Sequence, residues 1–232
     1  MAPSHLRVEH STAGYRQLLL ARPERRNALD LALARSLRDA LGEETSAPVV
    51  LGSTDPRVFC AGADLGVPDA DRAAVSDLVY ECCEIMITRP GPVIAVVSGA
   101  AVGGGAQLAA AADLRIAGPA ARLRWIGPAG RDLAVGAWVL TDLIGRGAAM
   151  ELALTGRWVE AAEALAMGLV NRVDDDPGRV AAGIAGELAA QGPGAPARVK
   201  GVMAAGGLLD RLQAERQANR AAWAQVTSPA TG

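Results

Sequence analysis

Short apolar runs alternate with longer stretches in which apolar residues recur every three or four positions. The runs at residues 49–52 and 93–97 carry no charge and are rich in valine and isoleucine, which is typical of β-strands, and the second is expected to be buried. Leucines at helical spacing over residues 31–41 follow Asp30, and they predict an amphipathic helix with an aspartate cap. Further strands are predicted at residues 6–9, 15–20, 114–116 and 122–125, the first two as a hairpin.

The second half of the chain carries a mainly helical pattern. Helices are predicted at residues 147–154, 160–167 and 179–226, the last with a Gly/Pro interruption at residues 192–196. An earlier helix is predicted at residues 73–88, before the Arg-Pro-Gly-Pro sequence. We therefore expect an α/β core over residues 1–178 and a helical C-terminal region over residues 179–232.

Residues 90–117 read PGPVIAVVSGAAVGGGAQLAAAADLRIA. They predict a short strand, a small-residue turn and an alanine-rich helix, with Gly103, Gly104 and Gly105 where the turn becomes the helix. A helix start has free backbone N–H groups and a positive dipole end, and glycine brings no side chain to keep a ligand away. The stretch therefore predicts a backbone site for an anion or a carbonyl oxygen. A glycine turn that only lets the helix pack on the strand is the alternative.

Composition and charge weigh against several classes of function. The net charge of −2 gives no electrostatic basis for binding nucleic acid or an anionic membrane. Three cysteines, two of them adjacent, offer neither a disulfide framework nor metal-ligand spacing. The two histidines, His5 and His10, give little support to a Ser–His–Asp hydrolase or a metal site. The N-terminus lacks the apolar core of a signal peptide, so we expect a cytoplasmic protein.

Four blocks of sequence, taken together, resemble the crotonase superfamily, the enoyl-CoA hydratase/isomerase family. They are RPERRNAL at residues 22–29, FCAGADL at residues 59–65 with the triple glycine, the segment at residues 149–156, and the segment at residues 164–173. The resemblance implies a crotonase-like (ClpP/crotonase) spiral of ββα turns with a helical C-terminal region, assembled as a homotrimer or hexamer. It also implies an acyl-CoA thioester as ligand, with coenzyme A present only as part of the substrate and no separate cofactor or metal.

In the family, two backbone N–H groups hold the thioester oxygen, and the matching residues here are Ala63 and Gly104. Charge moves onto that oxygen as the α-carbon gains or loses a proton, and two fixed amides in a dry site stabilise the enolate. Two of the residues that the resemblance places at the ligand have simpler alternatives. Arg25 and Arg26 are then a solvated basic pair, and Trp125 is a core residue. The resemblance places these residues around the acyl-CoA: Arg26, Ala28, Ala61, Gly62, Asp64, Leu65, Gly103, Trp125 and Gly127.

Family hydratases use two glutamates as general acid and base, and the matching positions here are Gln107 and Gly127. Glutamine forms hydrogen bonds but does not exchange a proton near neutral pH. A polar residue facing a neighbour in the core is the alternative for Gln107. Some relatives place an aspartate slightly later in the second loop, which makes Asp132 the candidate proton carrier. A surface aspartate beside Arg131 is the alternative there.

Two main functions remain open at this point. The first is an acyl-CoA-binding enzyme that works through a thioester enolate with non-standard acid/base residues. The second is a catalytically lapsed relative that holds or presents an acyl-CoA, and a purely structural scaffold is the third. The region after Trp223 is also shorter than in the family, whose C-terminal helices help to cover the CoA site, often that of a neighbouring subunit.

Overall fold

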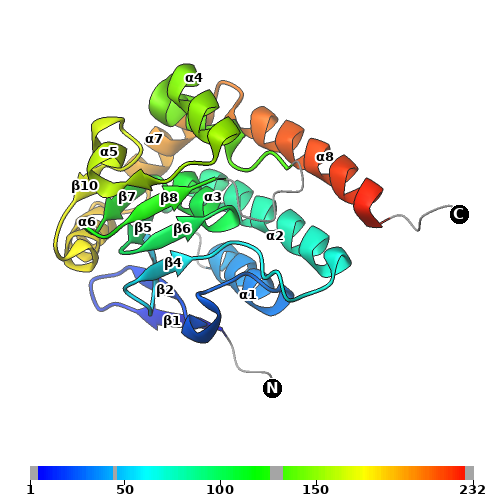
Figure 1. Cartoon of the computed structure of the whole chain (residues 1–232). Helices are drawn as coiled ribbons and strands as arrows, with labels where there is room; N and C mark the ends of the chain where they lie inside the picture. The colour runs from blue at the N-terminus through cyan, green and yellow to red at the C-terminus, as the bar shows by residue number, and fades with distance from the viewer. Residues whose placement is uncertain (1–4, 44–45, 126–132, 228–232) are drawn as a thin grey trace, which may run out of the picture.

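Strands and helices alternate along residues 5–43, 46–125 and 133–227, which are the residues described by this computed structural model (Figure 1). The strands are β1 (Leu6–His10), β2 (Arg16–Leu20), β3 (Val49–Ser53), β4 (Val58–Cys60), β5 (Val93–Val97), β6 (Ala100–Val102), β7 (Leu114–Ala117), β8 (Arg122–Arg124), β9 (Val159–Glu160) and β10 (Arg172–Val173). The helices are η1 (Pro23–Arg25), α1 (Leu31–Gly42), α2 (Asp69–Thr88), α3 (Gly104–Ala111), α4 (Ala137–Thr155), α5 (Ala161–Ala166), α6 (Pro177–Ala190), α7 (Gly194–Ala204) and α8 (Leu208–Thr227).

The strands form two sheets. The larger has the order β1-β2-β3-β5-β7-β10, and the smaller has the order β4-β6-β8-β9. After the antiparallel β1–β2 hairpin, the remaining pairs of the larger sheet are parallel. The chain puts one strand into the larger sheet, the next into the smaller sheet, and then forms a helix, in β3-β4-α2, β5-β6-α3 and β7-β8-α4. This repeated path is the ββα spiral that the sequence predicts.

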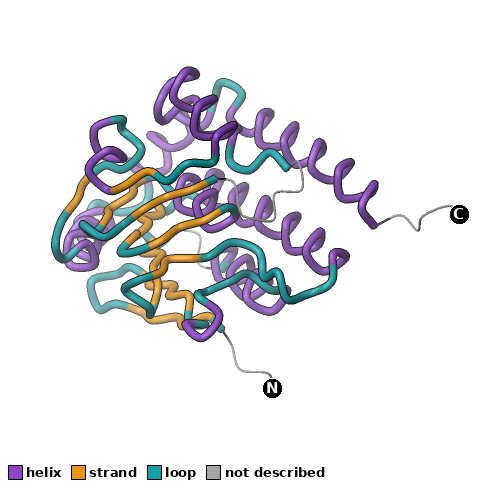
Figure 2. The backbone as a smooth tube through the Cα atoms, in the orientation of Figure 1, coloured by secondary structure: helices purple, strands orange, loops and turns teal. Residues whose placement is uncertain are grey.

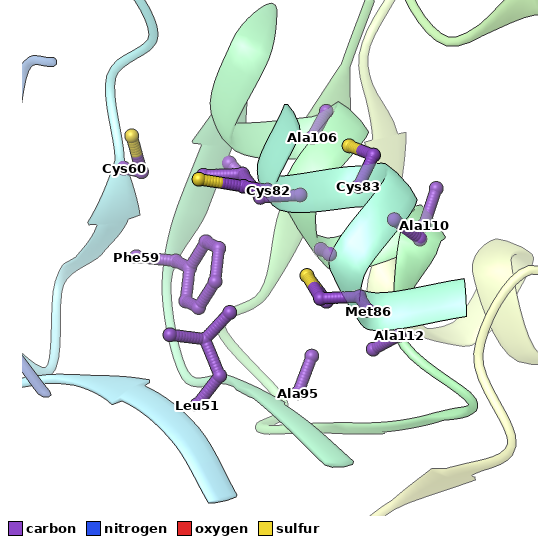
Figure 3. Close-up of a cluster of buried hydrophobic side chains, with 14 of the residues drawn as sticks. Leu51, Phe59, Cys60, Cys82, Cys83, Met86, Ala95, Ala106, Ala110 and Ala112 are labelled. Carbon is purple, nitrogen blue, oxygen red and sulfur yellow. The ribbon is translucent and has the colours of Figure 1, made fainter. Parts of the chain in front are cut away.

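Strand β5 is buried on both faces, which explains its uninterrupted apolar sequence. Val93, Ala95 and Val97 point into the main core, while Ile94 and Val96 belong to a second cluster closed by α6. Figure 3 shows part of the main core, a cluster of buried side chains that come from β3, β4, α2 and α3. The larger sheet is therefore the central layer of the molecule.

The smaller sheet differs from the sequence-based expectation at β4, β6 and β9, none of which was predicted as a strand. β6 lies in the segment that we expected to be a turn, and β9 overlaps the start of the helix predicted at residues 160–167. Each has only two or three residues, which is too short for a side-chain period to be visible. They are strands because β4 pairs with β6, β6 pairs with β8 and β8 pairs with β9.

The C-terminal helix α8 lies along α2 and also contacts α4 (Figure 1). Leu212 and Trp223 are buried, as their spacing suggests. Arg216 and Arg220 both bind the carboxylate of Asp77 on α2, at N–O distances of 2.7–2.8 Å. A break after Ala204, which the sequence analysis missed, separates α7 from α8. The division of the chain at residue 178 stays a prediction.

The Asp77 contacts predict a stability that depends on pH. The guanidinium groups of Arg216 and Arg220 hold the pKa of Asp77 below its usual value of 3.8. Because the depressed pKa belongs to the folded state, the contribution is fully present above the usual pKa and is lost as the pH falls below it. We expect Asp77→Asn to lower the melting temperature at pH 7. The difference from the parent protein should shrink toward zero in acid, and a difference independent of pH would contradict this account.

Candidate functional site

Three loops leave the smaller sheet at one edge, because β4, β6 and β8 are parallel and end there. β4 leads into residues 61–65, β6 into the three glycines, and β8 into Trp125. Figure 2 shows β4 in orange running into a loop in teal. The Gly103 N–H also donates to the Arg124 carbonyl oxygen, with an N–O distance of 2.8 Å. Segments far apart in sequence therefore meet at one place, as expected for ligand sites at the carboxyl ends of strands.

The first loop is held by a parallel bridge between Leu29 and Ala63. The Leu29 N–H donates to the Gly62 carbonyl oxygen at 2.7 Å, and the Asp64 N–H donates to the Leu29 carbonyl oxygen at 2.9 Å. These bonds use the peptide groups on either side of Ala63. The Ala63 N–H itself donates to no described residue.

The first and second loops touch through glycine. Gly62 has a φ of +83°, and a Cβ there would lie 2.7 Å from the Val102 carbonyl oxygen and 3.5 Å from the Gly104 nitrogen. A side chain at residue 62 would therefore force the loops apart. This contact brings the backbone beside Ala63 up to the backbone of Gly104.

Gly104 is the first residue of α3, and its N–H is one of the free amides of a helix start. It donates to no described residue. Gly103 before it has a φ of +53° and open space where a side chain would be. The N–H groups of Ala63 and Gly104 are therefore both available to a ligand oxygen, with the helix dipole adding to the second.

The turn at residues 22–30 supports this arrangement. Asn27 is fully buried, and its amide nitrogen donates to Ser53 Oγ at 2.7 Å and to the Phe59 carbonyl oxygen at 3.1 Å. Arg22 binds Asp64 Oδ2 at 2.7 Å. Burial favours the neutral acid, but the Gly66 N–H and the Arg22 guanidinium outweigh it and hold the pKa of Asp64 below its usual value. Asp64 is thus an ionised carboxylate whose charge is already paired.

Gln107 lies one helical turn after Gly104 and is only 2% exposed. Its Nε2 makes no well-formed hydrogen bond to the described residues, although the Gln107 side chain interacts with the Tyr80 hydroxyl. A Cβ added to Gly136 would lie 2.6 Å from Trp125 Nε1 and 3.8 Å from Gln107 Cβ. Gln107, Trp125 and Gly136 therefore form one wall, in which the Gln107 amide donor and the Trp125 indole N–H make no well-formed hydrogen bond to the described residues. Such a donor is costly to bury unless a ligand or water satisfies it.

The remaining predicted residues fall in different places. Ala28 is buried, and the Ala61 N–H donates to the carbonyl oxygen of Arg26, so all three lie beside the first loop. The side chain of Arg26 is exposed, in line with the solvated alternative, and Leu65 is 55% exposed. Asp132 and Gly127 lie outside the described residues.

Cys60 lies beneath the loops and is not available as a nucleophile. Its side chain is fully buried, and burial raises the pKa of the Cys60 thiol to about 12. Its Sγ contacts the Asn27 carbonyl oxygen at 3.1 Å. Cys60 therefore packs the turn against the first loop.

Sequence reasoning missed Asn27, Tyr80 and Glu215. Asn27 stands inside a block that we had quoted, but nothing local shows that its side chain turns inward. Tyr80 and Glu215 occupy helices with polar residues around them, and Glu215 reads as one more charge on a solvated face. A hydrogen bond of 2.8 Å joins their side chains across 135 positions of the chain.

Comparison with known proteins identifies the fold and the family. A family model described as enoyl-CoA hydratase/isomerase matches residues 11–231. The chain belongs to this family. A protein from Mycobacterium leprae named as a probable enoyl-CoA hydratase is 38% identical over 170 residues, which are 69% of this chain and 68% of that protein. The matched region of a Bacillus subtilis relative, named as an enoyl-CoA hydratase/isomerase, is 39% identical and spans 67% of this chain but only 64% of that protein.

Solved structures of enoyl-CoA hydratase/isomerase proteins share the fold. An enoyl-CoA hydratase from Bacillus anthracis aligns with a TM-score of 0.78 and 30% identity, over 97% of this chain and 92% of that chain. A monofunctional enoyl-CoA isomerase from M. smegmatis aligns with a TM-score of 0.75 and 29% identity, over 91% and 99%. The predicted crotonase fold is therefore confirmed. Because both a hydratase and an isomerase align, the comparisons leave the reaction open.

The packing of the glycines predicts very different losses of stability for alanine substitutions at two neighbouring positions. A Cβ at Gly105 would lie 2.4 Å from the Cys60 carbonyl oxygen, whereas a Cβ at Gly104 would make an ordinary contact of 3.4 Å with Leu29. We expect Gly105→Ala to lower the free energy of unfolding by about 3 kcal/mol or more, since backbone must move. Gly104→Ala should stay within about 1 kcal/mol of the parent protein. Chemical denaturation at one protein concentration compares them, and equal losses would refute the packing argument.

Proposed function

We propose that this protein binds an acyl-CoA thioester and carries out enolate-type chemistry with non-standard acid/base residues. The observation that carries the proposal is the pair of backbone N–H groups of Ala63 and Gly104, on two loops in contact and without acceptors among the described residues. Coenzyme A enters as part of the substrate. Together the two amides form an oxyanion hole for the thioester oxygen.

The two amides supply the stabilisation that such a reaction needs most. An enolate places negative charge on the thioester oxygen, and fixed N–H groups stabilise that charge without reorganising. The charges of Arg22 and Asp64 neutralise each other in an ion pair beside the first loop. The proposal therefore assigns the developing charge to backbone amides and the dipole of α3.

The proton transfer is assigned to residues other than the two family glutamates. We place Gln107 and Gly127 at the glutamate positions, so standard hydration lacks its usual acid and base. Gln107 orients the acyl group or a water through its amide, a role supported by the absence of a well-formed hydrogen bond from its Nε2 to the described residues. Asp132 is the proposed proton carrier.

The second candidate function is acyl-CoA binding without turnover. It is favoured by Gln107, since a buried carboxamide keeps its hydrogen-bonding capacity but carries no proton to transfer. This alternative uses the same oxyanion hole and differs only in the proton carrier.

The proposal includes an assembly of three or six chains and a cytoplasmic location. The exposed side chains of Val199, Val202 and Met203 on α7 support assembly, because they gather beside a cavity of about 540 Å³ that α7 also lines. No described helix is long and apolar enough to cross a membrane.

Isothermal calorimetry with crotonyl-CoA tests the function directly. Sustained heat after each injection would show turnover, and we then expect Asp132→Asn to abolish it while leaving binding intact. Saturable heat without sustained output would establish the binding function instead. An Asp132→Asn variant with full turnover removes that residue from the mechanism. No heat with crotonyl-CoA or with longer acyl chains would reject thioester binding altogether.

Replacing Gly104 tests the oxyanion hole. Proline at the first position of a helix is well tolerated and removes the N–H, whereas alanine keeps it. We expect Gly104→Pro to lose about 100-fold or more in turnover, as expected for one oxyanion donor. If the protein only binds, its preference for butyryl-CoA over free CoA should fall instead.

Gly104→Ala is the matched control and should keep the activity or the preference. Circular dichroism should show that both variants are folded. Equal behaviour of the two variants would mean that the Gly104 N–H does not hold the ligand.

A further inference from the structure

Helix α4 begins without a cap of its own. Its N-cap residue is Gly136, and no side chain within that turn accepts a hydrogen bond from the first amides. The acceptor comes from α8 instead. Glu215 Oε1 accepts from the Gly136 N–H at 2.7 Å, and Oε2 accepts from the Trp138 N–H at 3.0 Å. The carboxyl group of a residue 79 positions away thus caps the helix.

Two further side chains complete this buried group. The Tyr80 hydroxyl donates to Glu215 Oε1 at 2.8 Å and accepts from Asn219 Nδ2 at 2.7 Å. Asn219 Oδ1 accepts from the Ala134 N–H at 3.1 Å. Glu215 and Asn219 are 7% and 3% exposed. Together they fix the backbone from residue 134 to residue 138.

That backbone segment is one wall of the candidate site. Gly136 lies flush against the Trp125 indole and beside Gln107, so a shift of Gly136 moves the surface on which both side chains rest. Trp125 follows the strand residue that accepts the Gly103 N–H. Gln107 is one turn from the Gly104 amide. The contacts therefore run without a gap from Glu215 to the proposed oxyanion hole.

Anchoring α8 does not by itself require Glu215. The same helix is held to α2 by Arg216 and Arg220, which bind Asp77, and by Arg216 with Glu81. A buried carboxylate is expensive, and burial raises the pKa of Glu215 despite its hydrogen bonds. The Glu215 carboxyl group lies where it organises residues 134–138, away from the ion pairs that hold the helix.

We infer that Glu215, together with Asn219, is a positioning residue for the acyl group of the bound thioester. It acts through Gly136 on Trp125 and Gln107 and does not touch the substrate. The inference rests on the proposed function, because it assigns the wall formed by Gln107 and Trp125 to the acyl subsite. According to this inference, α8 supports the site through Glu215, in addition to packing on α2.

The test compares two variants, Glu215→Gln and Asp77→Asn. Asp77→Asn weakens the ion pairs between α8 and α2 and leaves the side chains that bind residues 134–138 unchanged. Calorimetry gives the affinities for butyryl-CoA and for free CoA, and their ratio isolates the acyl contribution. We expect Glu215→Gln to reduce this ratio about tenfold, the size of one hydrogen bond to a charged group. Asp77→Asn should change it less than about twofold, the usual effect of a partly exposed ion pair. Equal effects of the two variants, or an unchanged ratio in Glu215→Gln, would overturn the inference.

Hydrogen exchange provides a second measurement that needs no ligand. Deuterium uptake at residues 134–138 should be faster in Glu215→Gln than in the parent protein, and the increase should be clearly larger than in Asp77→Asn. If the parent protein binds no thioester, the proposed function fails, and unchanged exchange in Glu215→Gln would also reject the positioning role. If Glu215→Gln does not fold, Asn219→Ala takes its place in both measurements, with the same expected results.

Discussion

The contact between Gly105 and the Cys60 carbonyl group sets the spacing of the whole site. Helix α3 begins directly on the end of β4, closely enough that even a methyl group would collide with backbone. The Cys60 sulfur fills the adjacent space and contacts the carbonyl oxygen of Asn27. One small region therefore ties the turn at residues 22–30, the loop after β4 and the start of α3 together. The positions of the Ala63 and Gly104 amides follow from it.

This constraint explains why the site is made of backbone. Loops that approach so closely have no room for side chains between them. The residues at the two points of approach, Gly62 and Gly105, are therefore glycines. The charged residues nearby are used in support: Arg22 holds Asp64 and so fixes the loop. What the arrangement offers a ligand is a set of oriented N–H groups and a helix dipole. Oxygen atoms that gain negative charge are the natural partners of such groups.

The far wall of the site depends on a different kind of interaction. Gln107 and Trp125 rest against Gly136, whose position is fixed by a buried carboxylate on the last helix. The interior there is polar but largely satisfied, with Tyr80 and Asn219 sharing the hydrogen bonds of Glu215. Among the described side chains there, the exceptions are the Gln107 amide nitrogen and the indole N–H groups of Trp125 and Trp138. A packed backbone site thus lies one helical turn from a buried amide that has no well-formed hydrogen bond among the described residues. Such a site suits a ligand with one strongly polar atom and an apolar body.

The sequence by itself determined the features that are local. Asp30 caps its helix, the uncharged run at residues 93–97 is a doubly buried strand, and the triple glycine marks the start of α3. The family blocks, taken together, identified the fold. These succeed because caps, periodicity and glycine turns act within a few residues.

Only the tertiary structure decided the rest. β4 and β6 are strands because of their partners, since three residues carry no readable period. Glu215 has the same local sequence context as a solvated charge, yet it is buried because α8 lies against α2 and α4. Asn27 likewise holds residues that come more than 25 positions later in the chain. Long-range pairing and burial decide such roles, because the free energy of a buried polar group depends on partners that its neighbours in sequence do not reveal.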